Sequence, residues 1–397
     1  MADVTNYIDR LVAELCPDGV DFYTIDELII LDFGTRITKS KDAGTIYPVY
    51  GGGGASFRTD NYNREDKYVV SRFAMSEKCV RYVSGKFWML DSGFTYSVKD
   101  ESLLSYKYIS YWLLNAQQEI YACSSQSAQR NLKTAEFKRF EVPVPPLEIQ
   151  EAIVEILDKF TNLEAELEAE LEARTLQYEY YRDSLFEALD CPRVPLGELG
   201  KFYGGLKGKT KNDFGSSGAR YISYKNVYEN ISADFTWPDF VQVKEGENQL
   251  SLMKGDILLT GSSENMEESG LSSVVTKEPE EKAYLNSFSI CYRLNDPSIL
   301  NPEFSKYLFR SRLARKQIIR TAQGVTRFNV SKKKLANVSI PIPSLEEQQR
   351  IVDILDRFDA LTSSLSEGLP AELAARRSQY EYYRDQLLSF PRKGENQ

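Results

Sequence analysis

Two long stretches of the chain repeat apolar residues every three to five positions, with charged residues between them. In the first stretch, residues 148–190, this spacing predicts one amphipathic helix, and about 40 residues at 1.5 Å each give a rod of roughly 60 Å. Its apolar positions are Ile149, Ile153, Ile156, Leu157, Phe160, Leu163, Leu167, Leu171, Tyr178, Tyr181 and Leu185. Because a single apolar stripe has to be buried, we expect this helix to pair, antiparallel, with the second stretch.

The second stretch, residues 345–397, repeats the pattern with an interruption. Gly368 and Pro370 stand inside its periodic segment, and these residue types predict the end of one helix and the start of the next. The first stretch contains the segment LEAELEAELEAR at 163–174, which adds one leucine every four residues. Since four residues add about 6 Å to a helix, we interpret this segment as a strut whose length changes in steps.

The remaining parts, residues 1–147 and 191–344, have the patterning of mixed domains. Short runs rich in β-branched and aromatic residues, such as KYVVSRF and GDILLTGSS, are separated by Gly, Asn and Asp, which predicts strands joined by turns. Each part closes with a helical pattern, a loop and a proline-rich exit, and the first part also begins with a short helix. We therefore expect an α+β fold, in which the paired helices separate two pseudo-symmetric α/β domains with mostly antiparallel sheets.

The chain contains an internal repeat. The heptapeptide QYEYYRD occurs at 177–183 and 379–385, and PVPPLEIQEAIVEILDKF at 143–160 matches PIPSLEEQQRIVDILDRF at 341–358. The two copies are offset by 198 residues in the longer match and by 202 in the heptapeptide. This repeat predicts the order globular, helical, globular, helical with pseudo-twofold symmetry. Gene duplication without functional symmetry is the alternative interpretation.

Composition excludes several classes of enzyme. The 397 residues include no histidine, which removes Ser-His-Asp and Cys-His catalysis and histidine-based metal sites. The sequence also lacks a G-x-G-x-x-G run, an adenine-methylation signature, and nuclease or helicase motifs. The five cysteines form no C-x-x-C pair, and we find neither a signal peptide nor an apolar run of about 20 residues. We expect a cytoplasmic protein that recognises a ligand and is not an enzyme.

The net charge of −9 is unevenly distributed along the chain. Thirteen acidic and three basic residues lie between 148 and 190, and nine acidic and five basic residues lie between 345 and 390. The two globular parts together are therefore mildly basic. Although the total charge argues weakly against a nucleic-acid partner, this distribution is compatible with one.

Basic and aromatic residues surround a glycine run in the first domain. The run is YPVYGGGG at 47–54, and glycines allow a backbone to approach a ligand closely. Basic residues among aromatic ones are typical of contacts to DNA grooves and phosphates. A turn between two strands explains the glycines equally well. The candidate DNA contacts here are Arg36, Lys39, Lys41, Tyr50, Arg58 and Arg64.

A comparable cluster lies in the second domain. The loop GLKGKT at 205–210 is not a nucleotide-binding P-loop, because Tyr203 stands where that motif requires its first glycine. Its lysines suit the phosphates of a nucleic acid, and an ordinary solvated loop is the alternative. The segment ARYISYKNVY at 219–228 stands at the place comparable with the glycine run. The candidate DNA contacts are Lys207, Lys209, Lys211, Tyr224 and Lys225.

Two polar loops occupy the same place in both halves, just before the helical stretches. They are SSQSAQRNLK at 124–133 and AQGVTRFNVSKKK at 322–334. Side chains of these types bond to base edges or phosphates, whereas helix caps and solvated turns would explain part of each loop. The candidate DNA contacts are Gln129, Arg130, Gln323, Arg327 and Lys332.

The repeated QYEYYRD segments combine a seam with a polar face. Tyr178, Tyr181 and Leu185 share one helix face and predict a coiled-coil seam. The remaining residues point elsewhere, and the same polar face in two copies suggests two copies of a docking partner. The residues that we assign to the spacer or to a partner are Leu163, Leu167, Leu171, Tyr178, Tyr180, Tyr181, Arg182, Tyr380, Tyr382, Tyr383 and Arg384.

The chain resembles the specificity subunits of type I restriction–modification systems. The resemblance rests on the pattern P-x-P-[PS]-L-E-x-Q-x-x-I-V-x-I-L-D, followed by a helix ending in QYEYYRD, which occurs twice. It covers the whole chain, and the four-residue repeat is similar to that of the IC subclass. It implies that each globular domain reads one half of a split target in double-stranded DNA, that the helices set the spacing, and that the chain has no active site.

The resemblance also implies partners and cofactors. Two methyltransferase subunits would dock on the helices and bring S-adenosylmethionine, and two restriction subunits would bring ATP and magnesium. No cofactor or metal is expected in this chain. Two other classes stay open, namely a scaffold with duplicated domains for a sugar or peptide and an enzyme of unrecognised type. A scaffold for a sugar or peptide would not bind DNA, which distinguishes the first class. An enzyme would show turnover by the single chain, which distinguishes the second.

Overall fold

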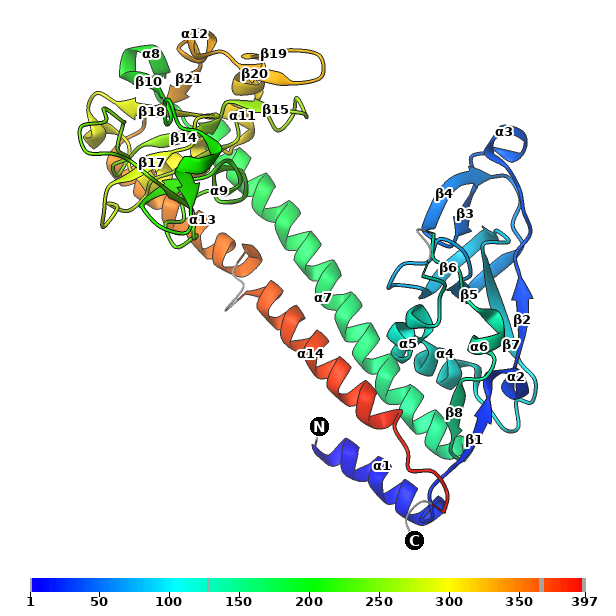
Figure 1. The fold of residues 1–397 in the computed structure, drawn as a ribbon. Coiled ribbons are helices and arrows are strands. Elements are labelled where there is room, and N and C mark those ends of the chain that lie inside the picture. The colour runs from blue at the N-terminus through cyan, green and yellow to red at the C-terminus, as the bar shows by residue number, and fades with distance from the viewer. Residues whose placement is uncertain (1, 127–128, 364–367, 395–397) are drawn as a thin grey trace. The chain divides into compact units, whose positions relative to one another are not determined.

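The computed structural model describes residues 2–126, 129–363 and 368–394 (Figure 1). Its contacts divide the chain into two compact units, which we describe separately. Unit 1 comprises Met1–Leu167 and Leu373–Gln397, and unit 2 comprises Glu168–Glu372. Helix α7 (Leu147–Glu187) runs from unit 1 into unit 2, and helix α14 (Leu369–Leu387) runs from unit 2 into unit 1.

Unit 1 is built on a six-stranded sheet with the strand order β2-β7-β5-β6-β3-β4 (Figure 1). The strands are β2 (Ile29–Phe33), β3 (Tyr47–Gly51), β4 (Gly54–Thr59), β5 (Arg64–Ser71), β6 (Val80–Met89) and β7 (Gly93–Val98). All neighbours are antiparallel except β3 and β6, where Val49 pairs with Trp88 and Tyr50 with Met89. A separate antiparallel ribbon joins β1 (Asp21–Thr24) to β8 (Glu141–Val144).

Helices complete unit 1. They are α1 (Ala2–Leu15), α2 (Ile25–Leu28), α3 (Lys39–Asp42), α4 (Tyr106–Asn115), α5 (Gln117–Ala122) and α6 (Thr134–Phe137), together with parts of α7 and α14. Helix α4 contacts β6 of the sheet. The main core of unit 1 combines Phe94 and Tyr96 of β7 with Tyr108 of α4 and Ile153 of α7. The start of the long helix is therefore anchored in the globular core of unit 1.

Unit 2 contains smaller sheets. One has the order β10-β18-β14-β16 and a second has the order β11-β13-β12-β17; β15, β20 and β19 form a third, and β21 pairs with β9. The strands are β9 (Arg193–Pro195), β10 (Gly200–Gly204), β11 (Phe214–Gly215), β12 (Ala219–Ile222), β13 (Phe240–Val241), β14 (Ile257–Thr260), β15 (Ser262–Ser263), β16 (Ser272–Val274), β17 (Ala283–Leu285), β18 (Ser289–Leu294), β19 (Ala322–Gln323), β20 (Phe328–Val330) and β21 (Ser339–Pro341).

The helices of unit 2 pack against the first of these sheets. They are α8 (Leu196–Leu199), α9 (Tyr224–Glu229), α10 (Pro302–Leu308), α11 (Arg312–Ile319), α12 (Lys332–Leu335) and α13 (Leu345–Ser363), with short 3-10 turns at Lys211–Asp213 and Pro297–Ile299. The core joins Tyr292 of β18, Phe304 of α10 and Ile351 of α13 to Phe186, near the end of α7. The end of the long helix thus belongs to the core of unit 2.

The two units share a strand topology, although their sequences differ. Strand β2 pairs with β7 as β10 pairs with β18, and β5 pairs with β7 as β14 pairs with β18. The parallel pair β3–β6 corresponds to β12–β17, where Tyr221 pairs with Tyr284. Two short strands of unit 2, β16 and β17, together take the place of the long β6. The predicted α+β fold with duplicated domains is confirmed, and the parallel pair is a feature that the sequence pattern did not indicate.

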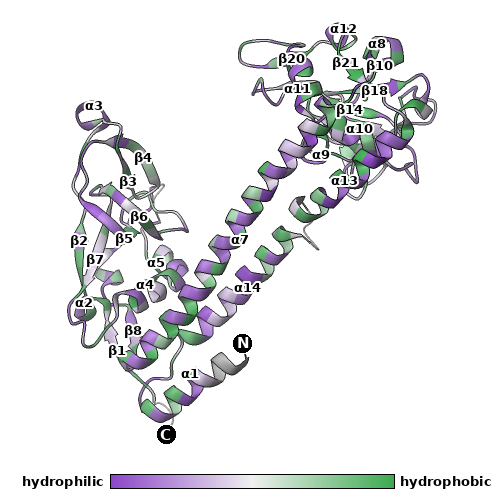
Figure 2. Ribbon diagram, turned by 180° about the vertical axis from the view of Figure 1, so that it is seen from behind, coloured by the Kyte–Doolittle hydropathy of each residue, from purple (hydrophilic) through white to green (hydrophobic). Residues whose placement is uncertain are grey.

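Helix pairing is antiparallel in each unit. In unit 1, Phe160 of α7 stacks on Tyr383 of α14 with ring centroids 5.7 Å apart, and Glu164 forms an ion pair with Arg377 at 2.6 Å. In unit 2, Phe358 of α13 stacks on Tyr181 of α7 at 5.5 Å. These stacks are the same contact made twice with the roles of the helices exchanged, as the repeat predicts. Figure 2 shows the hydrophobic residues recurring between hydrophilic ones along α7 and α14.

A buried glutamine anchors each long helix to its domain. The amide of Gln150 donates to the carbonyl oxygens of Leu103 and Pro145 and accepts from the Ser105 amide. Gln348 repeats these three bonds with Ile299, Pro343 and Asn301. Because neither glutamine is exposed to solvent, every bond replaces one that water would otherwise make.

The predicted interruption of the second helical stretch is confirmed. Helix α13 ends at Ser363 and α14 begins at Leu369, with Pro370 in its first turn. Within residues 2–126, 129–363 and 368–394, no helix combines the length and the apolar character that a membrane span requires.

Candidate nucleic-acid interface

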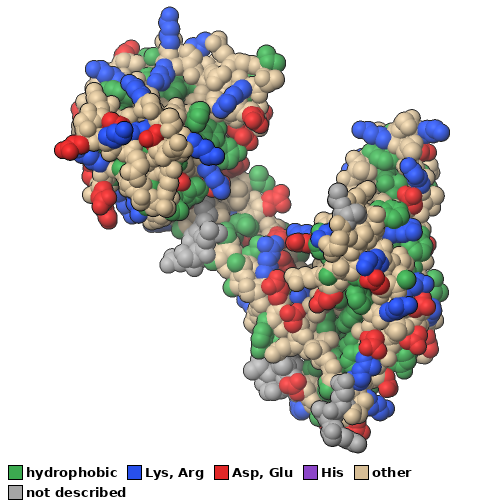
Figure 3. Space-filling model, viewed as in Figure 1, with side chains coloured by type: hydrophobic (Ala, Val, Ile, Leu, Met, Phe, Trp, Pro, Cys, Tyr) green, Lys and Arg blue, Asp and Glu red, His purple; other side chains and the backbone are tan. Residues whose placement is uncertain are grey.

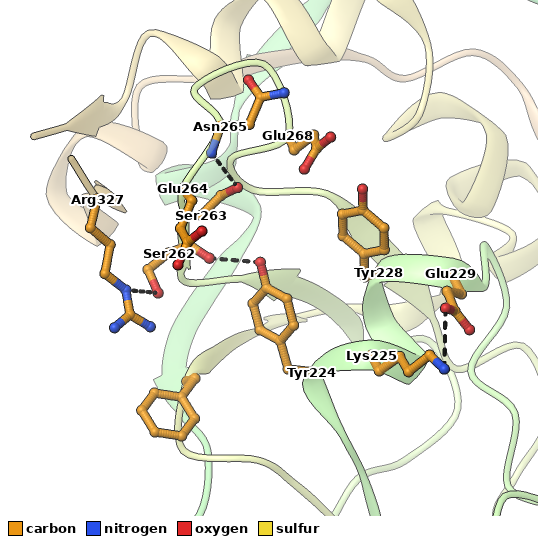
Figure 4. Close-up of a pocket in the computed structure, with 11 residues that line it drawn as sticks. Tyr224, Lys225, Tyr228, Glu229, Ser262, Ser263, Glu264, Asn265, Glu268 and Arg327 are labelled. Atoms are coloured by element: carbon orange, nitrogen blue, oxygen red, sulfur yellow. Dashed lines mark hydrogen bonds and ion pairs between the residues drawn. The ribbon is translucent and has the colours of Figure 1, made fainter. Parts of the chain in front are cut away.

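A groove of about 770 Å³ opens in unit 2 between helix α9 and the loop that follows β15 (Figure 4). It brings together three residues that the sequence analysis selected from separate segments, namely Tyr224, Lys225 and Arg327. The complete lining is Tyr224, Lys225, Tyr228, Glu229, Ser262, Ser263, Glu264, Asn265, Glu268, Phe288 and Arg327. Hydroxyl, amide, carboxylate and guanidinium groups therefore share one recess with aromatic rings.

Hydrogen bonds to Ser262 fix two of these side chains. The Tyr224 hydroxyl donates to the Ser262 carbonyl oxygen at 2.8 Å, and Nε of Arg327 donates to Oγ of Ser262 at 3.3 Å. The rings of Tyr224 and Tyr228 lie nearly parallel, with an angle of 19° and centroids 6.4 Å apart. Phe288, on the rim, is 63% exposed, which is unusual for a phenylalanine unless a partner covers it.

Acidic side chains outnumber basic ones in the lining of the groove. Lys225 pairs with Glu229 at 3.6 Å, so its charge is partly taken up. The hydroxyl of Tyr228 bonds to Glu268, and this bond raises the pKa of the tyrosine. With Glu264 as a third carboxylate in the lining, the groove is better suited to uncharged base edges than to phosphates.

Predicted lysines meet at a second place in unit 2. The end of β10 and the first residue of α12 lie close together, since a Cβ at Gly204 would stand 3.5 Å from Nζ of Lys332. Burial and the nearby ammonium of Lys207 lower the pKa of Lys332. Lys332 is followed by Lys333 and Lys334 on the same short helix. Lys211 is also exposed, at the 3-10 turn that follows the loop after β10. These ammonium groups form the strongest candidate phosphate contacts of this unit.

In unit 1, predicted cations gather at the end that carries α3. Lys39 and Lys41 lie on α3 and Arg36 on the preceding loop, and all three are exposed. Arg58 of β4 donates to the Ile46 carbonyl oxygen at 2.6 Å. Figure 3 shows basic side chains at this end of unit 1.

The glycine run forms the turn between β3 and β4, which is the alternative interpretation offered above. Gly51 pairs with Gly54 across the hairpin, and Gly54 has a φ of +121°. A Cβ at Gly52 would lie only 1.8 Å from the carbonyl oxygen of Phe73, so the backbones approach closely here. Tyr50, just before the turn, packs edge-on against Phe87 at 5.6 Å.

Two predicted DNA contacts, Arg64 and Lys209, form ion pairs within their own units. The Arg64 side chain is 15% exposed; it forms an ion pair with Asp32 at 2.7 Å and donates to Oγ1 of Thr95. The Lys209 side chain is 5% exposed and pairs with Glu247 at 2.5 Å. Both residues stay predicted DNA contacts, although each already has a carboxylate partner.

The polar loops hold the remaining candidates. Arg130 lies over the ring of Tyr121 at 4.5 Å and donates to Ser124, while Gln129 is exposed beside it. In unit 2, Gln323 is exposed on β19, whose partner strand β20 follows Arg327 directly. The predicted equivalence of the two loops agrees with the backbone, since Leu132 donates to Arg72 and Val330 donates to Gly261 in matching positions.

The first QYEYYRD segment exposes Tyr180 and, to a lesser degree, Tyr181, and the second segment exposes Tyr382. Tyr180 is 70% exposed and Tyr382 is 59% exposed, and each lies edge-on to the tyrosine that follows it. Tyr178 and Tyr380 are partly buried against the two cores, and Arg182 and Arg384 lie over their rings. These arginines therefore contribute packing within each unit, whereas the exposed tyrosines face outward. In the four-residue repeat, Leu163 is exposed and Leu167 and Leu171 are half-buried.

Sequence reasoning missed the residues that hold the groove together. Arg310 and Arg315 bond to backbone carbonyl oxygens of both walls. The sequence feature that could have indicated them is their position among apolar residues of a helical segment. Ser262 and Phe288 carried no distinguishing pattern. In the described parts of the chain, no group of three or more side chains could hold a metal ion.

Two units of one topology, linked by antiparallel helices and bearing an aromatic groove and lysine clusters, define a duplicated recognition protein of the nucleic-acid-binding class. The chain belongs to the family described as the type I restriction modification DNA specificity domain, whose model matches residues 17–173 and 191–375. It is therefore a DNA specificity subunit of this kind, as the repeated motifs suggested.

Several known proteins are similar to the chain. The EcoR124I/EcoR124II specificity subunit of Escherichia coli is 33% identical over 317 residues, which cover 74% of this chain and 73% of that protein. A putative type I restriction enzyme specificity subunit of Haemophilus influenzae is 28% identical over 400 residues, covering 94% and 96%.

Solved structures share the fold. The S subunit of a type I system from M. genitalium matches with a TM-score of 0.53 at 19% identity, covering 93% of this chain and 96% of that chain. A chain solved in work on complex assembly and conformational transition of the type I R-M system matches with a TM-score of 0.61 at 14% identity, covering 93% and 97%.

Proposed function

We propose that each unit reads one half of a split target in double-stranded DNA, and that the long helices set the number of base pairs between the halves. The observation that carries this proposal is the exchange of roles in the helix contacts. Phe160 and Phe358 make the same stack, and Gln150 and Gln348 make the same three bonds, in two units of one topology. Two equivalent domains held by equivalent anchors suit two half-sites.

Partners would supply the chemistry. Two methyltransferase subunits would dock on the helices, one near Tyr180 and one near Tyr382, and would bring S-adenosylmethionine. Restriction subunits would bring ATP and magnesium. The chain itself would contribute recognition and no catalytic group, which agrees with its lack of histidine. A scaffold for a sugar or peptide is not favoured, since the family is defined by DNA specificity.

Modification-sensitive sequencing tests the proposal directly. The chain is expressed with its methyltransferase in cells that lack other adenine methylation, and genomic DNA is read for modified sites. We expect a split motif, modified on both strands, that disappears when the chain is omitted. A continuous motif, or methylation that persists without the chain, would contradict the proposal.

A further inference from the structure

Arg327 is held so that the end of its guanidinium group faces the groove. Nε bonds to Oγ of Ser262 at 3.3 Å, and in the described residues no acceptor bonds to either terminal nitrogen. Figure 4 shows these nitrogens turned away from Ser262. A guanidinium oriented through Nε presents two parallel N–H donors, and this fork matches O6 and N7 of guanine in the major groove.

The surrounding charge separates a base contact from a phosphate contact. Glu229, Glu264 and Glu268 line the same groove, and Lys225 is paired with Glu229. Phosphates would meet three carboxylates here, whereas base edges carry no formal charge. The lysines around Lys207 and Lys332 offer phosphates a better site within the same unit.

Two half-buried arginines fix the walls of the groove. Arg310 donates to the carbonyl oxygens of Val227 at 3.1 Å and Tyr228 at 3.0 Å, and these two bonds hold α9 in place. Arg315 donates to the carbonyl oxygens of Glu267, Ser269 and Gly270 at 2.7, 2.8 and 2.6 Å, and these bonds hold the opposite loop in place. Burial lowers the pKa of both guanidinium groups to about 10, so both stay charged at neutral pH. Charged donors form the stronger hydrogen bonds, and both walls are fixed before a ligand arrives.

From this geometry we propose that Arg327 reads a guanine in the half-target of unit 2, and that Arg310 and Arg315 are positioning residues that hold the reading groove in shape. This inference rests on the proposed function and adds to it a base, a residue and a supporting framework. It predicts that the guanine belongs to the half of the motif that unit 2 reads.

The test substitutes Arg327 and reads the methylated motif from cells that also express the methyltransferase. In the Arg327→Ala variant we expect one guanine of a single half-target to become degenerate, while the other half and the gap stay unchanged. In the purified complex, the preference for guanine over other bases at that position should decrease by about 5-fold to 150-fold. Arg320→Ala, an exposed arginine at the end of α11 and outside the groove, is the matched control and should keep the motif.

Three outcomes would overturn the inference. An unchanged motif in Arg327→Ala would show that Arg327 reads no base. A uniform loss of affinity for all sequences, with a smaller salt dependence, would make Arg327 a phosphate contact. If Arg327→Ala abolishes methylation altogether, Arg327→Gln decides, because glutamine pairs with adenine and not with guanine. A glutamine that preserves the original motif would exclude the guanine contact. If the unsubstituted chain gives no split motif, the proposed function itself fails.

The positioning role has its own readout. Arg315→Met should broaden the motif at positions read by unit 2 without changing those read by unit 1, and Arg315→Lys should restore part of the selectivity. A merely structural role predicts a different result, namely less methylation at every site with the motif unchanged. That result in both variants would overturn the positioning assignment.

Discussion

At the scale of single residues, position decides which cations are available to DNA. Arg64 and Lys209 look like Lys207 and Lys332 in the sequence, but each of the first two forms an ion pair with a carboxylate of its own unit. Lys207 and Lys332 instead lie near each other, and their mutual repulsion contributes to the lowered pKa of Lys332. A negative phosphate would relieve that repulsion. This makes the pair a stronger candidate contact than either residue would be alone.

We predict that Lys207→Ala and Lys332→Ala weaken DNA binding equally for specific and nonspecific duplexes. Each loss of a phosphate contact should reduce the slope of log affinity against log salt by about one. The measurement is a DNA titration of the methyltransferase complex at salt concentrations from about 50 to about 200 mM. Lys254→Ala, an exposed lysine on another loop, is the control. A changed motif with an unchanged slope would contradict this prediction.

At the scale of elements, each long helix depends on one buried amide. Gln348 joins α13 to the loop before α10 through Ile299 and Asn301, and to the residues before α13 through Pro343. All of these partners are backbone groups, so a replacement side chain that cannot bond leaves them unsatisfied in the interior. The L-E-x-Q pattern contained this residue, but the sequence did not reveal its role.

We predict that Gln348→Leu lowers the free energy of unfolding by roughly 3 kcal/mol, because three buried backbone groups lose their partner. Gln150→Leu should have a similar effect on unit 1. Urea unfolding of each variant gives the measurement. Gln349→Leu, at an exposed neighbouring position, should change stability by less than about 0.5 kcal/mol. Equal effects of Gln348→Leu and Gln349→Leu would show that the amide is not an anchor.

The sequence predicted the long helices, their interruption and the duplication, because these follow from local periodicity and from repeated words. It did not predict the groove, because the contacts that shape the groove join distant segments. Tyr224 bonds to a residue 38 positions away, and Arg310 bonds to Val227 across 83 positions. The ion pairs of Arg64 and Lys209 could not be predicted for the same reason, since Asp32 and Glu247 are remote in the chain.

At the scale of the whole molecule, the four-residue repeat and the exposed tyrosines are the features that involve more than one domain or subunit. The repeat lies in the part of α7 where Leu163, Leu167 and Leu171 avoid full burial. Units of four residues can therefore be added or removed without opening a core. The exposed Tyr180 and Tyr382 occur once in each unit, as two copies of a partner would require.

We predict that deleting Leu167 to Glu170 shortens the gap of the DNA target and leaves both half-sequences unchanged. The deletion removes about 6 Å of helix, which corresponds to one or two base pairs at roughly 3.4 Å each. Modification-sensitive sequencing of the variant gives the gap directly. Replacing the same four residues by alanines preserves the length and should preserve the gap. An unaltered gap after the deletion would exclude the ruler.

We predict that Tyr180→Ala and Tyr382→Ala each weaken the docking of one methyltransferase subunit, and that the double variant weakens both. An exposed tyrosine that anchors an interface typically contributes about 2 kcal/mol or more, equivalent to roughly a 30-fold change in affinity. Light scattering of the purified complexes reports the stoichiometry. Tyr82→Ala, an exposed tyrosine of β6, should leave assembly intact. Full assembly of the double variant would place the docking surface elsewhere.

The arginine clamps of unit 2 also bear on how new specificities arise. Arg310 and Arg315 donate hydrogen bonds to main-chain carbonyl oxygens, which every amino acid supplies. None of these bonds involves a side chain that faces the groove. Mutations at Glu264 or Phe288, which line the groove, can therefore alter what the groove accepts while its walls stay in place. A framework of this kind separates foldability from selectivity, so that a lineage can explore new targets by point mutation without first losing its stability.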